Sequence, residues 1–167
     1  MACNRGPAES PFTAVLWLPA SLVRGQTVDI RVDSVASGRL EHFGLNDIRD
    51  MRTEYALGHG VHYVEGSARI VPGSGTANAR AGAKVWHEHG RIIALLPARI
   101  VNGDSYTPPS VEFAVQIDAP DGRQSVLGLW RYEVTANAFL IGDVRTHCVP
   151  TPKPFPLAAI QVESPPR

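Results

Sequence analysis

The sequence predicts an all-β protein: a single-domain antiparallel β-barrel, with a two-layer β-sandwich or jelly roll as the alternative. Three observations lead to this prediction. Fifteen glycines and fourteen prolines divide the chain into short runs rich in Val, Ile, Thr and aromatic residues. Two of these runs, Thr27 to Asp33 and Val111 to Asp118, alternate apolar and polar residues, as in a strand with one wet face. The chain of 167 residues is long enough to bury the core of one domain.

The N-terminal half contains strand candidates and the one helix that we expect. The strand candidates are residues 12–18, 27–33 and 61–71. Asn46 or Asp47 would cap a helix over residues 46–57, and Gly58 would end it. One side of that helix would carry Leu45, Ile48, Met51 and Tyr55. Such a helix would plug the end of a barrel or cover one side of a sheet.

The C-terminal half is a series of strands separated by turns. The strand candidates are residues 77–89, 91–101, 111–118, 124–134, 140–149 and 157–163. His89-Gly90-Arg91 marks a tight reversal, and Ala119 to Arg123 combines Pro and Gly as a hairpin turn. Eight or more strands in one domain are typical of a closed barrel or of two packed layers.

Composition and termini set the domain limits and exclude some function classes. We expect mobile tails at residues 1–10 and 164–167 and one β domain over residues 11–163. Sixteen basic and sixteen acidic residues give no net charge, so no nucleic-acid partner is expected. No apolar run approaches the ~20 residues of a membrane helix, and no signal-peptide pattern precedes residue 12. We therefore expect a cytoplasmic protein with no membrane partner.

The segment Trp86-His87-Glu88-His89 is the candidate metal site. On an extended strand His87 and His89 would point to the same face, and His147 would supply a third ligand. The pair resembles the first motif of cupin barrels, a jelly-roll family whose metal site begins with His-x-His on a strand. The motif departs from the cupin pattern afterwards, because no carboxylate follows until Asp104. The alternative interpretation is that the two histidines flank an exposed hairpin turn.

Aromatic residues form the candidate ligand-binding set. Trp130 and Tyr132 would share one face of a strand, and Arg131 would add a polar contact. The other aromatic members are Trp86, Phe113 and Tyr63. In a small barrel, inward aromatic side chains can line a ligand cavity. Plain core packing is the alternative for each of them.

The leading functional prediction is a β-barrel that binds an apolar or amphipathic small-molecule ligand without a cofactor. If the protein is an enzyme, we expect a cofactor-independent cyclase or isomerase that acts by restricting its substrate's conformation. The architecture is similar in outline to lipocalin-like and allene-oxide-cyclase-like barrels. Two alternatives remain open: a metal-dependent cupin-like enzyme, and a non-catalytic assembly or interaction module that uses strand edges. Self-association into a homo-oligomer is compatible with each of them.

Overall fold

The computed structural model describes residues 12–36, 45–73, 83–101, 109–138, 142–148 and 155–167. Within these ranges the regular elements are all strands: β1 (Phe12–Trp17), β2 (Ser21–Val23), β3 (Thr27–Ala36), β4 (Leu45–Leu57), β5 (Val61–Tyr63), β6 (Arg69–Val71), β7 (Lys84–Glu88), β8 (Arg91–Val101), β9 (Ser110–Ile117), β10 (Gly122–Ala138), β11 (Gly142–Cys148) and β12 (Phe155–Glu163). No helix in these ranges is long and apolar enough to cross a membrane. The all-β prediction is confirmed.

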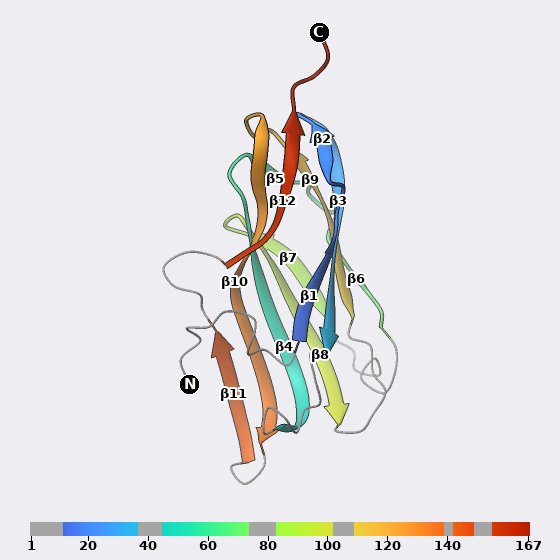
Figure 1. Ribbon diagram of the computed structural model, residues 1–167. Coiled ribbons are helices and arrows are strands. Elements are labelled where there is room, and N and C mark those ends of the chain that lie inside the picture. The colour runs from blue at the N-terminus through green and yellow to red at the C-terminus, as the bar shows by residue number, and fades with distance from the viewer. Residues whose placement is uncertain (1–11, 37–44, 74–82, 102–108, 139–141, 149–154) are drawn as a thin grey trace.

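The strands form two sheets (Figure 1). Sheet A has the order β1-β3-β9-β5, and β6 also pairs with β9. Sheet B has the order β2-β12-β10-β4-β8-β7, and β11 also pairs with β10. The described pairings are antiparallel except for β2 with β12, which is parallel. Two separate sheets among the described strands match the two-layer alternative and not the closed barrel.

The core lies between the two sheets and draws on the inward positions of both. Sheet A contributes Ile30, Val32, Val111, Phe113, Val115 and Ile117. Sheet B contributes Met51, Tyr55, Ile92, Leu96, Leu127 and Ile160. These side chains come from strands that alternate inward and outward residues, so each strand covers the core with one face. Burying each large apolar side chain contributes about 1.5–3 kcal/mol.

The helix expected over residues 46–57 is absent, because this segment is the long strand β4. β4 pairs with β8 on one side and with β10 on the other. Met51 and Tyr55 face the core with Thr53 between them, which is a period of two and not the helical period. A register shift against β8 between Ile48 and Asp50 interrupts that alternation. The interrupted pattern placed Ile48, Met51 and Tyr55 at spacings that also suit a helix.

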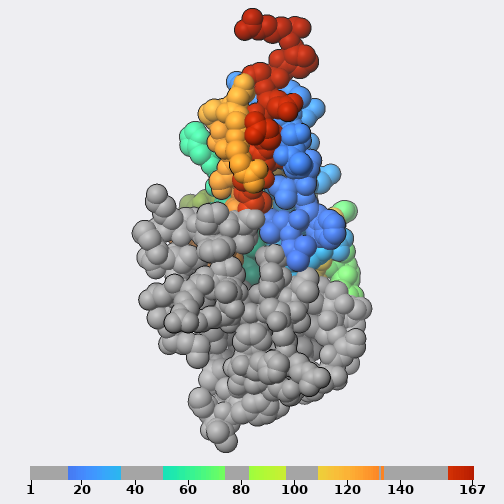
Figure 2. Space-filling model, in the orientation of Figure 1, coloured from blue at the N-terminus to red at the C-terminus, as the bar shows by residue number. Residues whose placement is uncertain are grey.

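The hairpin turn expected over Ala119 to Arg123 is wrong: the chain bends at Asp121 and enters β10 at Gly122 without closing a hairpin. β9 belongs to sheet A and β10 to sheet B, so the chain passes from one layer to the other here. Asp121 anchors this passage through Arg24 and the hydroxyl of Ser164. Figure 2 shows the C-terminal residues (red) on the surface between β10 (orange) and the N-terminal strands (blue).

Register shifts along β10 decide which of its side chains face the core. Leu127 pairs with Leu57, and Leu129 pairs with Tyr55. Arg131 then pairs with Glu54, so Trp130 is left as an extra residue between the two pairs. Such a bulge reverses the alternation that follows it. Trp130 and Arg131 therefore lie on the outer side of sheet B.

The chain passes very close to β10 directly after β4. The backbone N–H of Gly58 donates a hydrogen bond to the carbonyl of Val126 at 2.9 Å. A Cβ atom on Gly58 would lie 1.9 Å from the carbonyl oxygen of Ser125. Only glycine fits this approach without moving backbone.

Candidate functional site

The six residues predicted to bind a small molecule do not converge on one cavity. Phe113 is buried in the core between the sheets. Trp130 lies outside sheet B, where the guanidinium carbon of Arg91 lies 4.3 Å from its ring centroid. Arg131 is on the same outer side and lies 3.4 Å from Glu133. Tyr132 is on β10 opposite Thr53, and its side chain is outside the described residues.

The remaining two members, Trp86 and Tyr63, lie on different layers. Trp86 is on β7 of sheet B, and its indole N–H donates a hydrogen bond to Glu88 at 3.3 Å. Tyr63 is on β5 of sheet A and stacks on the ring of His87 with centroids 4.6 Å apart. The Tyr63 hydroxyl accepts a hydrogen bond from the backbone N–H of Ala68. These contacts make Tyr63 a bridge between the sheet edges, which is a packing role.

The three histidines proposed as metal ligands are also separated. His87 is on β7 and has Glu65 3.6 Å from its Nδ1, whereas the side chain of His89 is 82% exposed in the turn that follows. His89 and Gly90 have φ values of 50° and 70°, as in a two-residue type I′ turn. The prediction of a tight reversal there is confirmed. His147 is on β11, four strands from β7, or roughly 19 Å at the usual strand spacing.

No group of three or more His, Cys, Asp or Glu side chains suited to a metal ion occurs within the described part of the chain. The topology explains this for the predicted set. Since β8, β4 and β10 separate β7 from β11, the backbone cannot bring His147 to His87. The three histidines do not form one site.

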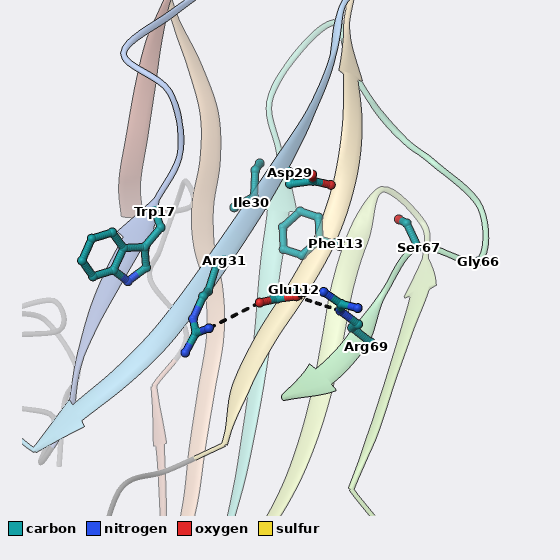
Figure 3. A pocket seen from close by; sticks show the side chains of 9 residues that line it. All are labelled: Trp17, Asp29, Ile30, Arg31, Gly66, Ser67, Arg69, Glu112 and Phe113. Atoms are coloured by element: carbon teal, nitrogen blue, oxygen red, sulfur yellow. Dashed lines mark hydrogen bonds and ion pairs between the residues drawn. The ribbon is translucent and has the colours of Figure 1, made fainter. Parts of the chain in front are cut away.

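A hollow of about 670 Å³ lies on the outer face of sheet A (Figure 3). It is lined by Trp17, Asp29, Ile30, Arg31, Gly66, Ser67, Arg69, Glu112 and Phe113. Strands β1, β3, β9 and β6 supply its floor, and the connection between β5 and β6 supplies one wall. Because the hollow is outside the core, it is open to a partner.

The register of strands β1, β3, β9 and β6 aligns the polar side chains on the floor of this hollow. Trp17 pairs with Arg31, Arg31 with Glu112, and Glu112 with Arg69, so four side chains form one row across four strands. Arg31 lies 3.4 Å from Glu112, and Arg69 donates a hydrogen bond to Glu112 at 2.7 Å (Figure 3). Such cross-strand pairs of opposite charge stabilise a sheet by roughly 0.2–1 kcal/mol each. The row fixes the positions of the charged groups beside Trp17.

Asp33 holds the exposed indole of Trp17 in place. The Trp17 side chain is an exposed large apolar group, and the residue is 59% exposed. Its Nε1 donates a hydrogen bond to Asp33, whose other oxygen accepts from Arg31 and Ser110. Partial burial raises the pKa of Asp33, but the hydrogen bonds from Ser110, Arg31 and Trp17 outweigh it, so the pKa lies below its usual value.

The wall of the hollow is a break in the edge of sheet A. β5 and β6 both pair with β9, and of the connection between them Gly66 and Ser67 line the hollow. The Ser67 hydroxyl accepts a hydrogen bond from the backbone N–H of Ala114 at 3.0 Å and donates one to the carbonyl of Val64. Ser67 thereby replaces the missing strand partner, and Gly66 forms the rim with a φ of 76°.

Sequence reasoning did not single out Trp17 or Asp33. The run Val15 to Leu18 is apolar throughout. It predicts a strand but does not indicate which of its side chains face solvent. The signal lies in the neighbouring strand, where Arg31 and Asp33 alternate with buried Ile30 and Val32. Pairing that polar face with β1 identifies Trp17 as outward, but the pairing itself requires the fold.

No protein-family model and no curated protein sequence matches this chain. The fold is similar to that of a cohesin module from a Clostridium perfringens family 33 glycoside hydrolase, with a TM-score of 0.50 and 10% identity over 92% of this chain and 98% of that one. The collagen-binding domain of the Erysipelothrix rhusiopathiae surface protein RspB has a TM-score of 0.49 and 13% identity over 93% of this chain and 47% of that one. The group B streptococcus pilus 2b backbone protein has a TM-score of 0.42 and 14% identity over 84% of this chain and 56% of that one.

The prediction of a small-molecule-binding barrel, including the cyclase or isomerase activity and the small-molecule partner, is wrong. Its aromatic lining is divided between the core and the outer face of sheet B, and the space between the sheets is filled by apolar side chains. The fold is instead similar to that of a cohesin module.

Proposed function

We propose that this chain is a non-catalytic interaction module that binds a protein partner through the outer face of sheet A. The observation that carries the proposal is Trp17, a tryptophan that is exposed and at the same time held rigidly beside a hollow. Tryptophan and arginine are the residue types most enriched among binding hot spots. A side chain that is already ordered loses little conformational entropy when a partner covers it.

The chemistry of the hollow indicates what the partner presents. The indole face of Trp17 offers an apolar surface to an aliphatic or aromatic side chain. Five charged side chains lie in or beside the hollow. Three are carboxylates, Asp29, Asp33 and Glu112, and two are guanidinium groups, Arg31 and Arg69, so negative charge is in excess. A partner side chain with a positive charge, placed near exposed Asp29, would balance this excess. We infer a protein segment with an apolar residue next to a lysine or arginine.

The fold comparison supports a modular role without specifying a partner. The cohesin module is, by its name, one module of a glycoside hydrolase, and this chain spans nearly its whole length. An identity of 10% shows the fold alone. The proposal therefore depends on the site described above and not on that protein's interactions.

Affinity capture followed by a titration tests the proposal. The wild-type protein and Trp17→Ala are immobilised and exposed to extract of the source organism, and proteins retained by the wild type alone are identified. Each candidate is then purified and titrated by calorimetry. We expect Trp17→Ala to weaken binding by roughly thirtyfold or more, as for a hot-spot residue. The matched control is Val64→Ala, which shortens another exposed apolar side chain that does not line the hollow. Equal affinity of wild type and Trp17→Ala for every captured protein would refute the proposal.

A further inference from the structure

The outer face of sheet B carries three arginines around one buried glutamate. Glu54, on β4, has a side chain that is only 5% exposed. Arg52 Nη2 lies 3.3 Å from its Oε1, Arg91 Nη1 lies 4.0 Å from the same oxygen, and Arg131 Nε lies 3.9 Å from Oε2. Strand register creates the cluster, because Arg131 is opposite Glu54 and Arg52 is two residues before it on the same face. We call these four residues the Glu54 cluster.

Two tryptophans fix the arginine planes in the Glu54 cluster. The guanidinium carbon of Arg91 lies 4.3 Å from the ring centroid of Trp130, and that of Arg52 lies 5.9 Å from the ring centroid of Trp86. A guanidinium group over an aromatic ring is held by cation–π attraction, and its N–H groups at the edge stay available as donors. The arginines are thus oriented before any partner arrives.

The arginines of the Glu54 cluster have carboxylates beside them and still remain partly exposed. Arg131 has a second carboxylate, Glu133, at 3.4 Å. Among the side chains that the structure describes, Arg52 and Arg91 both contact the Glu54 carboxylate, and Glu88 on β7 is the register partner of Arg91. Both arginine side chains remain about one-third exposed. The exposed parts of these two oriented guanidinium groups can therefore receive a carboxylate that a partner brings.

We propose that this face of sheet B is a second docking surface, which binds an acidic segment of a protein partner. Carboxylates suit the forked donors of Arg52 and Arg91, since arginine binds carboxylate groups through two parallel hydrogen bonds. The rings of Trp86 and Trp130 give the site apolar walls, which suit a peptide segment. The whole chain has no net charge, so long-range attraction to an extended polyanion is not its mode of binding. This inference stands independently of the Trp17 hollow, which is on the other sheet.

Fluorescence anisotropy with a labelled acidic peptide tests this surface. The probe is a short fluorescein-labelled peptide in which glutamate alternates with alanine, and the reference peptide has glutamine in place of glutamate. We expect the wild type to bind the acidic peptide and not the reference, with weaker binding as salt is added. The double variant Arg52→Gln and Arg91→Gln should weaken binding at least tenfold. Arg91→Lys, which keeps the charge but not the fork, should weaken it severalfold.

Matched controls separate a specific surface from general charge. Arg123→Gln removes one positive charge from an exposed position of β10 and should leave binding unchanged. Trp17→Ala should bind the acidic peptide as tightly as the wild type, so failure here and failure of the proposed sheet A site are distinguishable. Circular dichroism verifies that each variant is folded. If the double variant does not fold, Arg91→Lys tests the site in its place.

Three outcomes would overturn the inference. The wild type could fail to distinguish the acidic peptide from the glutamine peptide. Arg123→Gln could weaken binding as much as the double variant does. Tripolyphosphate could displace the peptide as effectively as unlabelled peptide at equal charge, which would show a general anion site and not a surface for an acidic protein segment.

Discussion

The indole Nε1 of Trp17 donates a hydrogen bond to Asp33 Oδ2 at 2.7 Å, across the pair of strands β1 and β3. The same carboxylate accepts from Arg31 and Ser110, so it is fixed by donors from β3 and β9 as well. A rigid acceptor thereby restrains a ring that is largely exposed.

Removing the carboxylate should release the ring. In a background where Trp86 and Trp130 are replaced by phenylalanine, Asp33→Ala should lower the fluorescence anisotropy of Trp17 and increase its quenching by acrylamide. The cause is the lost hydrogen bond from the indole N–H. Asp29→Ala, which removes the outward carboxylate four residues before Asp33 on β3, is the control and should change neither quantity. An unchanged anisotropy in Asp33→Ala would show that Asp33 does not position Trp17.

Asp33 should also make stability depend on pH. Its pKa in the folded protein is below the unfolded value of about 3.9, so its stabilising contribution is complete above that value and is lost as pH falls through the folded pKa. The free energy of unfolding of the wild type should exceed that of Asp33→Asn at neutral pH, and the difference should shrink below about pH 4. Urea unfolding at a series of pH values measures this. Asp121, whose pKa is also lowered, stays in both proteins and cancels.

The close approach at Gly58 should be intolerant of a side chain. Gly58→Ala would place Cβ against the backbone carbonyl of Ser125, so β4 and β10 would have to move apart. We expect a loss of several degrees or more in the melting temperature. Gly66→Ala is the matched control, because its Cβ would meet nothing within 4 Å and only its φ of 76° opposes the change. A similar small loss in both variants would contradict the crowding described at Gly58.

Phe113 should be essential for stability and not for ligand recognition. Phe113→Ala removes a large ring from the core between the sheets and should lower the free energy of unfolding by about 3–5 kcal/mol. Phe113→Leu keeps most of the volume and should cost clearly less. Denaturant unfolding measures both changes. A loss below about 1 kcal/mol for Phe113→Ala would mean that this part of the core is loosely packed.

The parts of the fold that could be predicted from the sequence are those in which local pattern and environment agree. The stretch Thr27 to Asp33 alternates regularly, because β3 has one face on the core and one in solvent, and its outer face forms part of the floor of the hollow. The turn at His89 and Gly90 is confirmed for the same kind of local reason: two residues with positive φ close a hairpin. The exchange of layers after Ile117 could not be predicted, since a turn residue pattern does not say which sheet the next strand joins.

The candidate sites could not be predicted from the sequence, because they depend on strand pairing and on a bulge and not on local sequence pattern. β4 is covered on its core face by apolar side chains and on its outer face by the arginines around Glu54, so neither face has the polar pattern of an exposed surface. The bulge at Trp130 reverses the direction of the side chains after it, and this moves Arg131 from the predicted interior to the outside. Trp17 became recognisable only when the pairing of β1 with β3 placed it opposite Arg31.

The position of β12 constrains the order in which this fold can be completed. β12 pairs with β10 on one side and with β2 on the other, so residues 155–163 occupy an interior place in sheet B. During synthesis, β2 emerges from the ribosome long before β12, and β10 also emerges before it. Until then both keep an unpaired row of backbone groups, which is the kind of edge that recruits foreign strands. A chain that lacks residues 155–163 should therefore aggregate more readily than the complete fold.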